Sequence, residues 1–494
     1  MTQGRRRRAV GFAACITVVA LGACVTAVQT TPPLQTTPPR QMTPAEPTTS
    51  FTWTVKLLPG GDTAVGALET VLCFSGAPPE HVGPENLRAL PWLMDLPRPV
   101  NASGGALGPP LRVDAQGIVT RGLAPGECVS FSVDIEGAAK DLDDRDVATV
   151  AGRQILASPD AWLWRPSPWP AHAVGRLVVE HAIQESTTRI AVPMLQNPDG
   201  SYQVPRSTFA LQCFAVLGDF ESTDLEIRGA TFQVVRIDAG GIDDETFTRW
   251  LHIAVDDVAV PLQAFPVSQV LLLLLPVSGA REVDAGFLGR GGGASALFLL
   301  GRGPFDIADD PEILDDDGRW VFTHELAHTL LPPVARGDGW LNEGLTTWHQ
   351  EVLPAAAGRR LRTVSQGQLE VGFRTGRARA RQDGLSVKDS CSLMESRGSY
   401  QHCYWAGARL FDLLSKEVGD DGVFALVATL HAAGAVDAAP QSALRLLKAV
   451  SSSADPRAYA AAQTLLGLWE QHQHSLFPDP LTTPAAAATV PTSY

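Results

Sequence analysis

Residues 321–330 constrain this chain most, because they combine a helical pattern with a metal-binding pattern. They read Val-Phe-Thr-His-Glu-Leu-Ala-His-Thr-Leu, and prolines follow at 332–333. His324 and His328 are four residues apart, so a helix places both on one face, and the prolines end that helix. Two imidazoles at this spacing can bind one zinc ion. Glu325 follows the first histidine, where its carboxylate can reach a metal-bound water.

A third ligand is expected from residues 340–348, Trp-Leu-Asn-Glu-Gly-Leu-Thr-Thr-Trp, which begin a second amphipathic helix. Glu343 lies near the first turn of that helix and can face the histidine pair across a short hairpin. Three protein ligands leave the fourth zinc position to water, as in catalytic zinc sites. We therefore predict one Zn²⁺ per chain, bound by His324, His328 and Glu343. Two other side chains on the same helix remain possible third ligands: His349 and Glu351.

The two motifs together resemble the gluzincin metallopeptidases, and they are most similar to the aminopeptidase N and glycyl aminopeptidase families. Residues 404–407, Tyr-Trp-Ala-Gly, match the Tyr-x-x-Gly motif that opens a helix in those families. The resemblance implies a thermolysin-like zinc peptidase domain in which Glu325 is the general base. It also implies that Tyr404 donates a hydrogen bond to the oxyanion of the transition state. Tyr400 is a nearby alternative for this role.

Two features depart from the family pattern. The spacer at 329–342 has 14 residues, where those aminopeptidases commonly have roughly eighteen. In the aminopeptidase N family a Gly-Ala-Met-Glu-Asn strand supplies a glutamate for the substrate amine, and the corresponding stretch here, 291–296, has no acid. We therefore expect no strict dependence on a free N-terminal amine, although Asp284 or Glu395 could supply the acid. We expect the strand at 291–300 to be a sheet edge that pairs with a peptide.

The first residues, 1–23, are typical of an export signal, because four arginines precede an apolar stretch too short to span a bilayer comfortably. The stretch ends in Leu-Gly-Ala-Cys, which resembles a bacterial lipobox and makes Cys24 the lipidated residue. A plain secretory signal cut near the same place is the alternative. Residues 24–50 are rich in Thr and Pro, which favours an extended tether. We expect an exported, membrane-anchored lipoprotein on the periplasmic or cell-surface side of a bacterial envelope.

Export also permits disulfides. Five cysteines remain when Cys15 and Cys24 are set aside. The plausible pairs by sequence region are Cys73–Cys128 and Cys391–Cys403, which leaves Cys213 free. Five cysteines allow other pairings, so these two pairs are a hypothesis.

The remaining sequence predicts an α+β chain. Short apolar runs broken by Gly, Pro and Asp at 51–238 predict a β-rich, antiparallel sandwich-like N-terminal domain. A helix, apolar strands and the zinc helices predict a catalytic domain at 239–403, and helices at 404–475 complete it. The tail at 476–494 is rich in Pro, Ala and Thr, which predicts disorder.

The charge balance excludes one class of partner. Lys and Arg total 39 against 53 Asp and Glu, a net charge of −14, which argues against a nucleic-acid binder. The expected partners are a peptide or protein substrate and, through the lipid, a membrane. The sequence therefore predicts a secreted, lipid-anchored zinc metallopeptidase. Two alternatives stay open: a catalytically idle surface-binding protein on a peptidase scaffold, and a zinc hydrolase of another amide or ester.

Overall fold

The structure is a computed structural model, and it describes residues 51–144, 147–170, 173–181, 187–210, 213–237, 244–278, 283–301, 320–434 and 440–479. The predicted signal peptide and tether, including Cys24, lie outside the described residues, as does the tail from residue 480 onward.

The N-terminal strands form three sheets. The largest has the order β13-β11-β1-β2-β7-β4, and burial alternates along β1 (Phe51–Leu58) because one face of the strand packs on a core. β1 pairs in parallel with β11 (Gly175–His181), so this sheet is mixed, whereas the sequence predicted an antiparallel one. Parallel pairing needs a long crossover connection. The intervening strands supply that crossover, and no local pattern in the sequence reveals it.

The other two N-terminal sheets are smaller, with the orders β10-β3-β6-β5 and β12-β14-β9-β8. The core beside them is rich in aromatic rings, and the indoles of Trp53 and Trp169 stack there. The remaining elements of this part of the chain are β2 (Ala67–Phe74), β3 (His81–Gly83), η1 (Leu87–Trp92), β4 (Arg98–Val100), β5 (Val113–Asp114), β6 (Gly117–Val119), β7 (Cys128–Asp134), α1 (Ile135–Leu142), β8 (Ala148–Ala151), β9 (Gln154–Ala157), α2 (Pro159–Trp162), β10 (Arg165–Ser167), β12 (Arg189–Ala191), β13 (Tyr202–Val204), α3 (Ser207–Ala210) and β14 (Ala215–Gly218).

A five-stranded sheet with the order β15-β16-β17-β19-β18 precedes the zinc motif. Its first strands are β15 (Glu221–Ile227), β16 (Ala230–Arg236) and β17 (Gln269–Val277). β17 is a nearly continuous apolar run, which is typical of a central strand with both faces covered. β16 pairs in parallel with β17, so one sheet contains strands from both sides of the domain boundary predicted at 238/239. The alternating pattern of β15 and β16 does not reveal which sheet they join.

The edge of this sheet is β18 (Val283–Arg290), and not the strand predicted at 291–300. β19 (Ala294–Gly301) lies between β17 and β18, so its backbone groups are already paired on both sides. β18 reads Val-Asp-Ala-Gly-Phe-Leu-Gly-Arg, and its two glycines and single β-branched residue give a weak strand signal. Pairing with the apolar β19 stabilises it as a strand.

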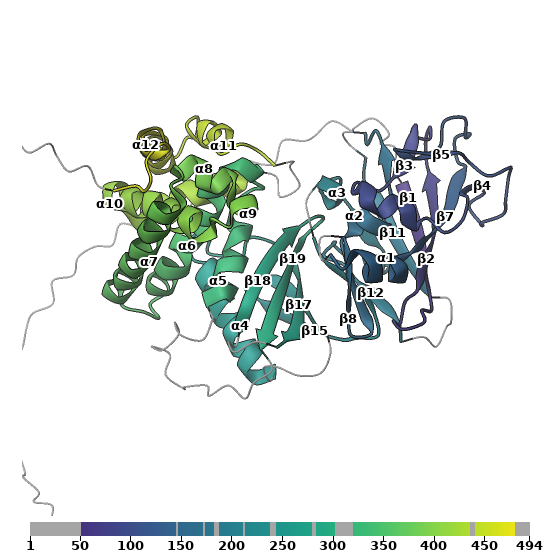
Figure 1. The fold of residues 1–494 in the computed structure, drawn as a ribbon, viewed down its shortest axis with the longest axis horizontal. Helices are drawn as coiled ribbons and strands as arrows, with labels where there is room; N and C mark the ends of the chain where they lie inside the picture. The colour runs from purple at the N-terminus through teal and green to yellow at the C-terminus, as the bar shows by residue number, and fades with distance from the viewer. Residues whose placement is uncertain are drawn as a thin grey trace, which may run out of the picture. The chain divides into compact units, whose positions relative to one another are not determined.

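Helices cover the sheet and complete the chain (Figure 1). α4 (Asp244–Val258) and α5 (Trp320–Ala327) share the hydrophobic core with β17 and β19. α10 begins at Tyr400, so the boundary predicted at 403/404 falls inside one helix. The described helices include none that is long and apolar enough to cross a membrane. The remaining helical elements are η3 (His328–Leu330), η4 (Arg336–Asp338), α6 (Gly339–Ala356), α7 (Arg362–Asp383), α8 (Val387–Ser392), α9 (Met394–Arg397), α10 (Tyr400–Ala433), α11 (Ala443–Val450) and α12 (Pro456–His472).

Candidate metal centre

His324, His328 and Glu343 converge on one point from three elements. His324 lies in α5, His328 in the turn η3 that follows it, and Glu343 in the second turn of α6. Glu343 Oε2 lies 3.5 Å from Nε2 of each histidine. Among the described residues, this buried carboxylate oxygen has no hydrogen-bond donor. A carboxylate oxygen between two imidazole nitrogens fits the ligand set of a catalytic zinc ion.

Amide oxygens behind the two imidazoles set their tautomers. His324 Nδ1 lies 2.8 Å from Gln350 Oε1, and His328 Nδ1 lies 3.1 Å from Asn342 Oδ1. Because an amide oxygen only accepts, each Nδ1 carries the proton and each Nε2 keeps its lone pair for a metal. Burial lowers the pKa of His328 to about 4, so its ring is neutral at pH 7. Neutral imidazole is the form that binds zinc.

The alternative third ligands have other surroundings. Glu351 Oε2 pairs with Arg360 Nη1 at 3.0 Å, and Glu351 Oε1 accepts a hydrogen bond from Gln350 Nε2 at 3.1 Å. His349 is fully buried against aromatic rings of α6 and α10. In the part of the chain that the structure describes, the His/Glu cluster contains neither of them. The geometry therefore favours Glu343 as the third ligand.

Glu325 is placed as a proton acceptor beside the ligands. Its carboxylate accepts a hydrogen bond from the backbone N–H of Leu288 in β18. Burial raises the pKa of Glu325 to about 7, and the charge of Glu343 acts in the same direction. A Cβ atom at Gly286 would lie 2.5 Å from Glu325 Cγ, so the glycine allows β18 to approach the zinc helix this closely. The site thus holds a carboxylate that can take up a proton near pH 7.

Tyr404 contacts the ligand set directly. Its hydroxyl hydrogen-bonds to the Glu343 carboxylate, and its ring centroid lies 5.7 Å from that of His324. Burial, followed by the charge of Glu343, raises the pKa of Tyr404 above its usual value, so the hydroxyl keeps its proton at pH 7. The motif implied that Tyr404 opens a helix, but Tyr404 lies in the second turn of α10. Tyr400 opens it, and that side chain is 41% exposed.

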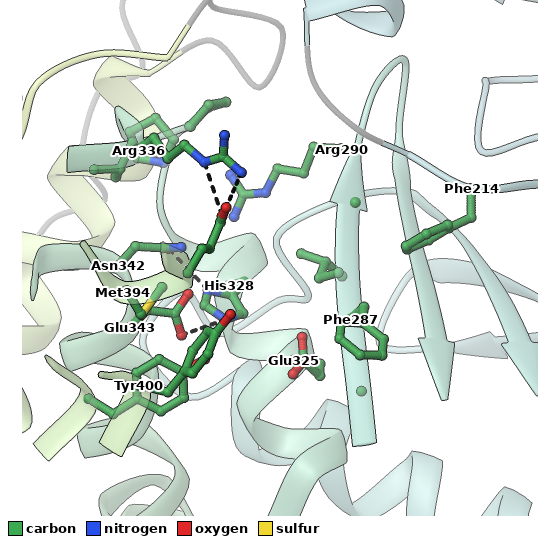
Figure 2. A pocket seen from close by; sticks show the side chains of 18 residues that line it. Phe214, Phe287, Arg290, Glu325, His328, Arg336, Asn342, Glu343, Met394 and Tyr400 are labelled. Carbon is green, nitrogen blue, oxygen red and sulfur yellow. Dashed lines mark hydrogen bonds and ion pairs between the residues drawn. The ribbon is translucent and has the colours of Figure 1, made fainter. Parts of the chain in front are cut away.

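A cavity of about 560 Å³ lies beside these side chains (Figure 2). The strand residues that line it are 286–290 of β18, and not 291–296 as the resemblance suggested, because the latter form a turn and the start of β19. The side chain at the end of this lining segment is the cation Arg290. Asp284 is exposed and is not part of the lining, whereas Glu395 lines the cavity and pairs with Arg336.

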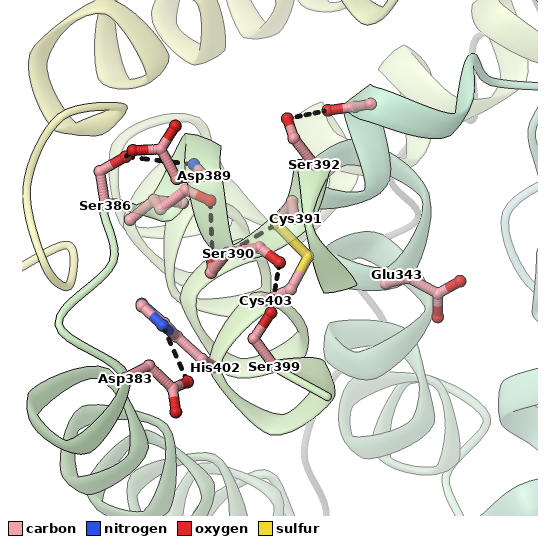
Figure 3. Close-up of a disulfide and its surroundings, with 12 residues drawn as sticks. Glu343, Asp383, Ser386, Asp389, Ser390, Cys391, Ser392, Ser399, His402 and Cys403 are labelled. Carbon is pink, nitrogen blue, oxygen red and sulfur yellow. Dashed lines mark hydrogen bonds and ion pairs between the residues drawn. A yellow bond between two sulfur atoms is a disulfide. The ribbon is translucent and has the colours of Figure 1, made fainter. Parts of the chain in front are cut away.

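Two disulfides are present in the described part of the chain. Cys73–Cys128 joins the adjacent strands β2 and β7, and Cys391–Cys403 joins α8 to α10. These are the pairs that the sequence analysis favoured, and Cys213 is a buried free thiol. Figure 3 shows the second disulfide, with Glu343 on a neighbouring helix. The segment that this disulfide closes contains three cavity-lining residues: Met394, Glu395 and Tyr400.

Sequence analysis missed Asn342, Gln350 and Arg290. A signal for the two amides was present, because polar residues recur every four positions at 342, 346 and 350 in a helix that is otherwise mostly apolar. That spacing places them on one helical face. Arg290 had no comparable signal, because the strand that positions it was not recognised.

Comparison with solved structures shows which fold the chain shares. It matches an aminopeptidase N family protein from Idiomarina loihiensis with a TM-score of 0.60 and 14% identity, covering 82% of this chain and 73% of that chain. It matches an M1 zinc metallopeptidase from Deinococcus radiodurans with a TM-score of 0.52 and 16% identity, covering 88% of this chain and 95% of that one. No protein-family model and no curated protein sequence matches the chain.

The chain has the fold of the M1 zinc metallopeptidases. Identities of this size show the fold alone, and the roles of the residues rest on the geometry described above. A variant of the Deinococcus enzyme was solved with a Tyr-Ser-Ala substrate bound, at a TM-score of 0.51 and 16% identity to this chain.

Proposed function

We propose that this chain is a gluzincin-type zinc metallopeptidase that hydrolyses peptide bonds. The observation that supports it is the convergence of His324, His328 and Glu343 beside a cavity that Glu325 and Tyr404 also line. A zinc ion bound by the three ligands would supply a Lewis acid that polarises the scissile carbonyl and acidifies water. The buried Glu343 Oε2, for which the described residues offer no hydrogen-bond donor, lies 3.5 Å from Nε2 of His324 and of His328, and these three atoms fit such an ion.

The chain's own residues supply the proton transfers. Glu325 takes a proton from the attacking water and passes it to the amine that leaves. The Leu288 N–H holds that carboxylate toward β18. The Tyr404 hydroxyl donates a hydrogen bond to the carbonyl oxygen as negative charge develops on it. Because its pKa is raised, Tyr404 stays protonated and can act as this donor.

The free edge of β18 supports a peptide as the substrate. Among the described strands, β18 pairs with β19 on one side only, and residues 286–290 of β18 line the cavity. An unpaired strand edge offers N–H and C=O groups to an extended peptide backbone.

The test is digestion of a mixed peptide library by the zinc-loaded protein, with products read by mass. Glu325→Gln should keep zinc and lose nearly all hydrolysis, because an amide cannot act as the base. Tyr404→Phe should keep zinc and lower kcat by roughly 10²–10³, whereas Tyr400→Phe should change kcat much less. Zinc binding without cleavage of any peptide would favour an idle binding protein. Cleavage of esters or non-peptide amides alone would favour the alternative of a zinc hydrolase that acts on another amide or ester.

We also propose that the protein is exported and anchored to the membrane by a lipid on Cys24. The support is the lipobox-like sequence and the arginine-rich signal that precedes it. Cys24→Ser should release the protein from the membrane fraction or block its processing. Unchanged membrane association of this variant would reject lipidation at Cys24.

A further inference from the structure

The charged side chains that line the cavity are mostly paired with one another. Arg336 Nε lies 3.0 Å from Glu395 Oε1, and its Nη2 contacts the other carboxylate oxygen. Glu343 faces the two histidines, and Glu325 accepts the Leu288 N–H. Each carboxylate of the described lining therefore has a partner or a role, and Arg290 is the lining arginine that this pairing does not include.

Arg290 is a cation that pairs with no carboxylate among the described residues. Its Nη1 donates to the backbone carbonyl of Leu331, and no described carboxylate forms an ion pair with it. Burial lowers the pKa of Arg290 to about 10, so the guanidinium stays charged at pH 7. The Leu331 carbonyl occupies one of five N–H donors, and a partly buried cation without a counter-charge is unfavourable until an anion reaches it.

The position of Arg290 places its charge beside the catalytic residues. Gly286 and Arg290 are four residues apart on β18, so both lie on the same face of the strand. That face meets α5, because a Cβ at Gly286 would touch Glu325. Figure 2 shows the side chain reaching from β18 across the cavity toward Arg336.

We propose that Arg290 makes this cleft select peptides with a carboxylate side chain near the scissile bond, and disfavour a free ammonium group at that place. The inference rests on the proposed peptidase function. A guanidinium presents parallel N–H groups that match a carboxylate and bind it in a bidentate manner. An ammonium group in the same place would meet a like charge in a poorly solvated cavity. Arg290 is thus a specificity-determining residue at the end of the substrate-pairing strand.

Binding tests this without hydrolysis. The zinc-loaded Glu325→Gln protein is titrated with acetylated octapeptides in which one position is Glu, Gln or Lys, and each position is tried in turn. At one position the Glu peptide should bind about 10-fold more tightly than the Gln peptide, the scale of one charge-assisted hydrogen-bonded contact. Adding Arg290→Met should bring that ratio to about one, and Arg290→Lys should keep part of it. Arg374→Met, which removes an exposed cation from α7, should leave the ratio unchanged.

Zinc content and thermal unfolding of each variant show whether it is folded. A Glu preference that survives Arg290→Met, or its absence from the parent protein, would overturn the inference. Failure of the proposed peptidase function can be distinguished from failure of this specificity inference. If the Glu preference depends on Arg290 but the zinc-loaded wild-type chain cleaves none of these peptides, the specificity assignment stands and the peptidase assignment falls.

Discussion

Gly344 and Gly407 meet backbone to backbone where α6 contacts α10. A Cβ atom at Gly344 would lie 2.5 Å from Gly407 Cα, and one at Gly407 would lie 2.6 Å from Gly344 Cα. Gly344 follows the predicted ligand Glu343, and Gly407 lies three residues after Tyr404. This contact therefore determines how closely the Tyr404 hydroxyl approaches the ligand carboxylate. It gives a physical reason for the glycine in each of the two motifs.

Gly407→Ala should force the two helices apart. Overpacking of this kind costs about 1–3 kcal/mol of folding free energy, and the shift should weaken both zinc binding and kcat. Urea unfolding, zinc titration and peptide hydrolysis measure the three effects. The control is Gly467→Ala in α12, where a Cβ meets nothing within 4 Å; it should stabilise the protein by about 0.5–1 kcal/mol. Equal behaviour of the two variants would contradict the packing argument.

Gln350 should contribute to zinc affinity although it is not a ligand. Its Oε1 accepts the His324 Nδ1 hydrogen, and its Nε2 donates to Glu351, so its amide is held in one orientation. Gln350→Leu should weaken zinc binding about 10–100-fold, the usual effect of losing a partner behind a histidine ligand. Competition with a chromophoric chelator measures the affinity. Gln382→Leu, on the exposed end of α7, should leave it unchanged, and the argument fails if the two variants bind zinc equally.

The Cys391–Cys403 disulfide should support catalysis as well as stability. It closes a loop with a sequence separation of 12, and a loop of this size is worth about 3 kcal/mol in the chain-entropy model. Replacing both cysteines by alanine should also lower kcat, because the freed segment carries part of the cavity wall. The matched control removes Cys73–Cys128, which should cost stability and leave kcat unchanged. Both double variants are assayed well below their unfolding temperatures, so that loss of folded protein does not affect kcat. Equal kcat values for the two variants would contradict the prediction.

The three candidate metal ligands could be predicted from the sequence because helical spacing is local. Residues four apart share a helical face in any fold, so His324 and His328 needed no tertiary information. Glu343 can face the histidines only if the hairpin between the two helices has the right length. The sequence motif around Glu343 supported the hypothesis that it is the third ligand. The structure brings all three together.

The strand beside the site could not be predicted in the same way. β18 has two glycines and is stabilised by pairing with β19, which is a tertiary interaction. The apolar run of β19 was recognised, yet apolar residues alone do not reveal which strand is at the edge. The place of Arg290 depends on that topology, so the cation of the cavity was missed together with β18.

His349 should make the folded state sensitive to acid. Burial lowers its pKa to about 3, and neither ring nitrogen has a hydrogen-bond partner among the described residues. In the unfolded chain an ordinary histidine binds a proton below about pH 6.5. The unfolded state therefore binds more protons than the folded state between about pH 6.5 and 3, so stability falls as the pH falls through that range. At about pH 5 this effect amounts to about 2 kcal/mol.

His349→Leu should remove this loss and also relieve the cost of two buried, unpaired nitrogens, about 1–3 kcal/mol each. The expected result is a variant more stable than wild type at about pH 7.5, with a larger advantage at about pH 5. Urea unfolding of the zinc-free proteins at both pH values measures it, since metal release then adds no pH dependence of its own. His252→Leu, at an exposed position of α4, should show no growing advantage in acid. A constant difference between wild type and His349→Leu at the two pH values would mean that His349 is protonated in the folded protein, against the burial that the structure shows.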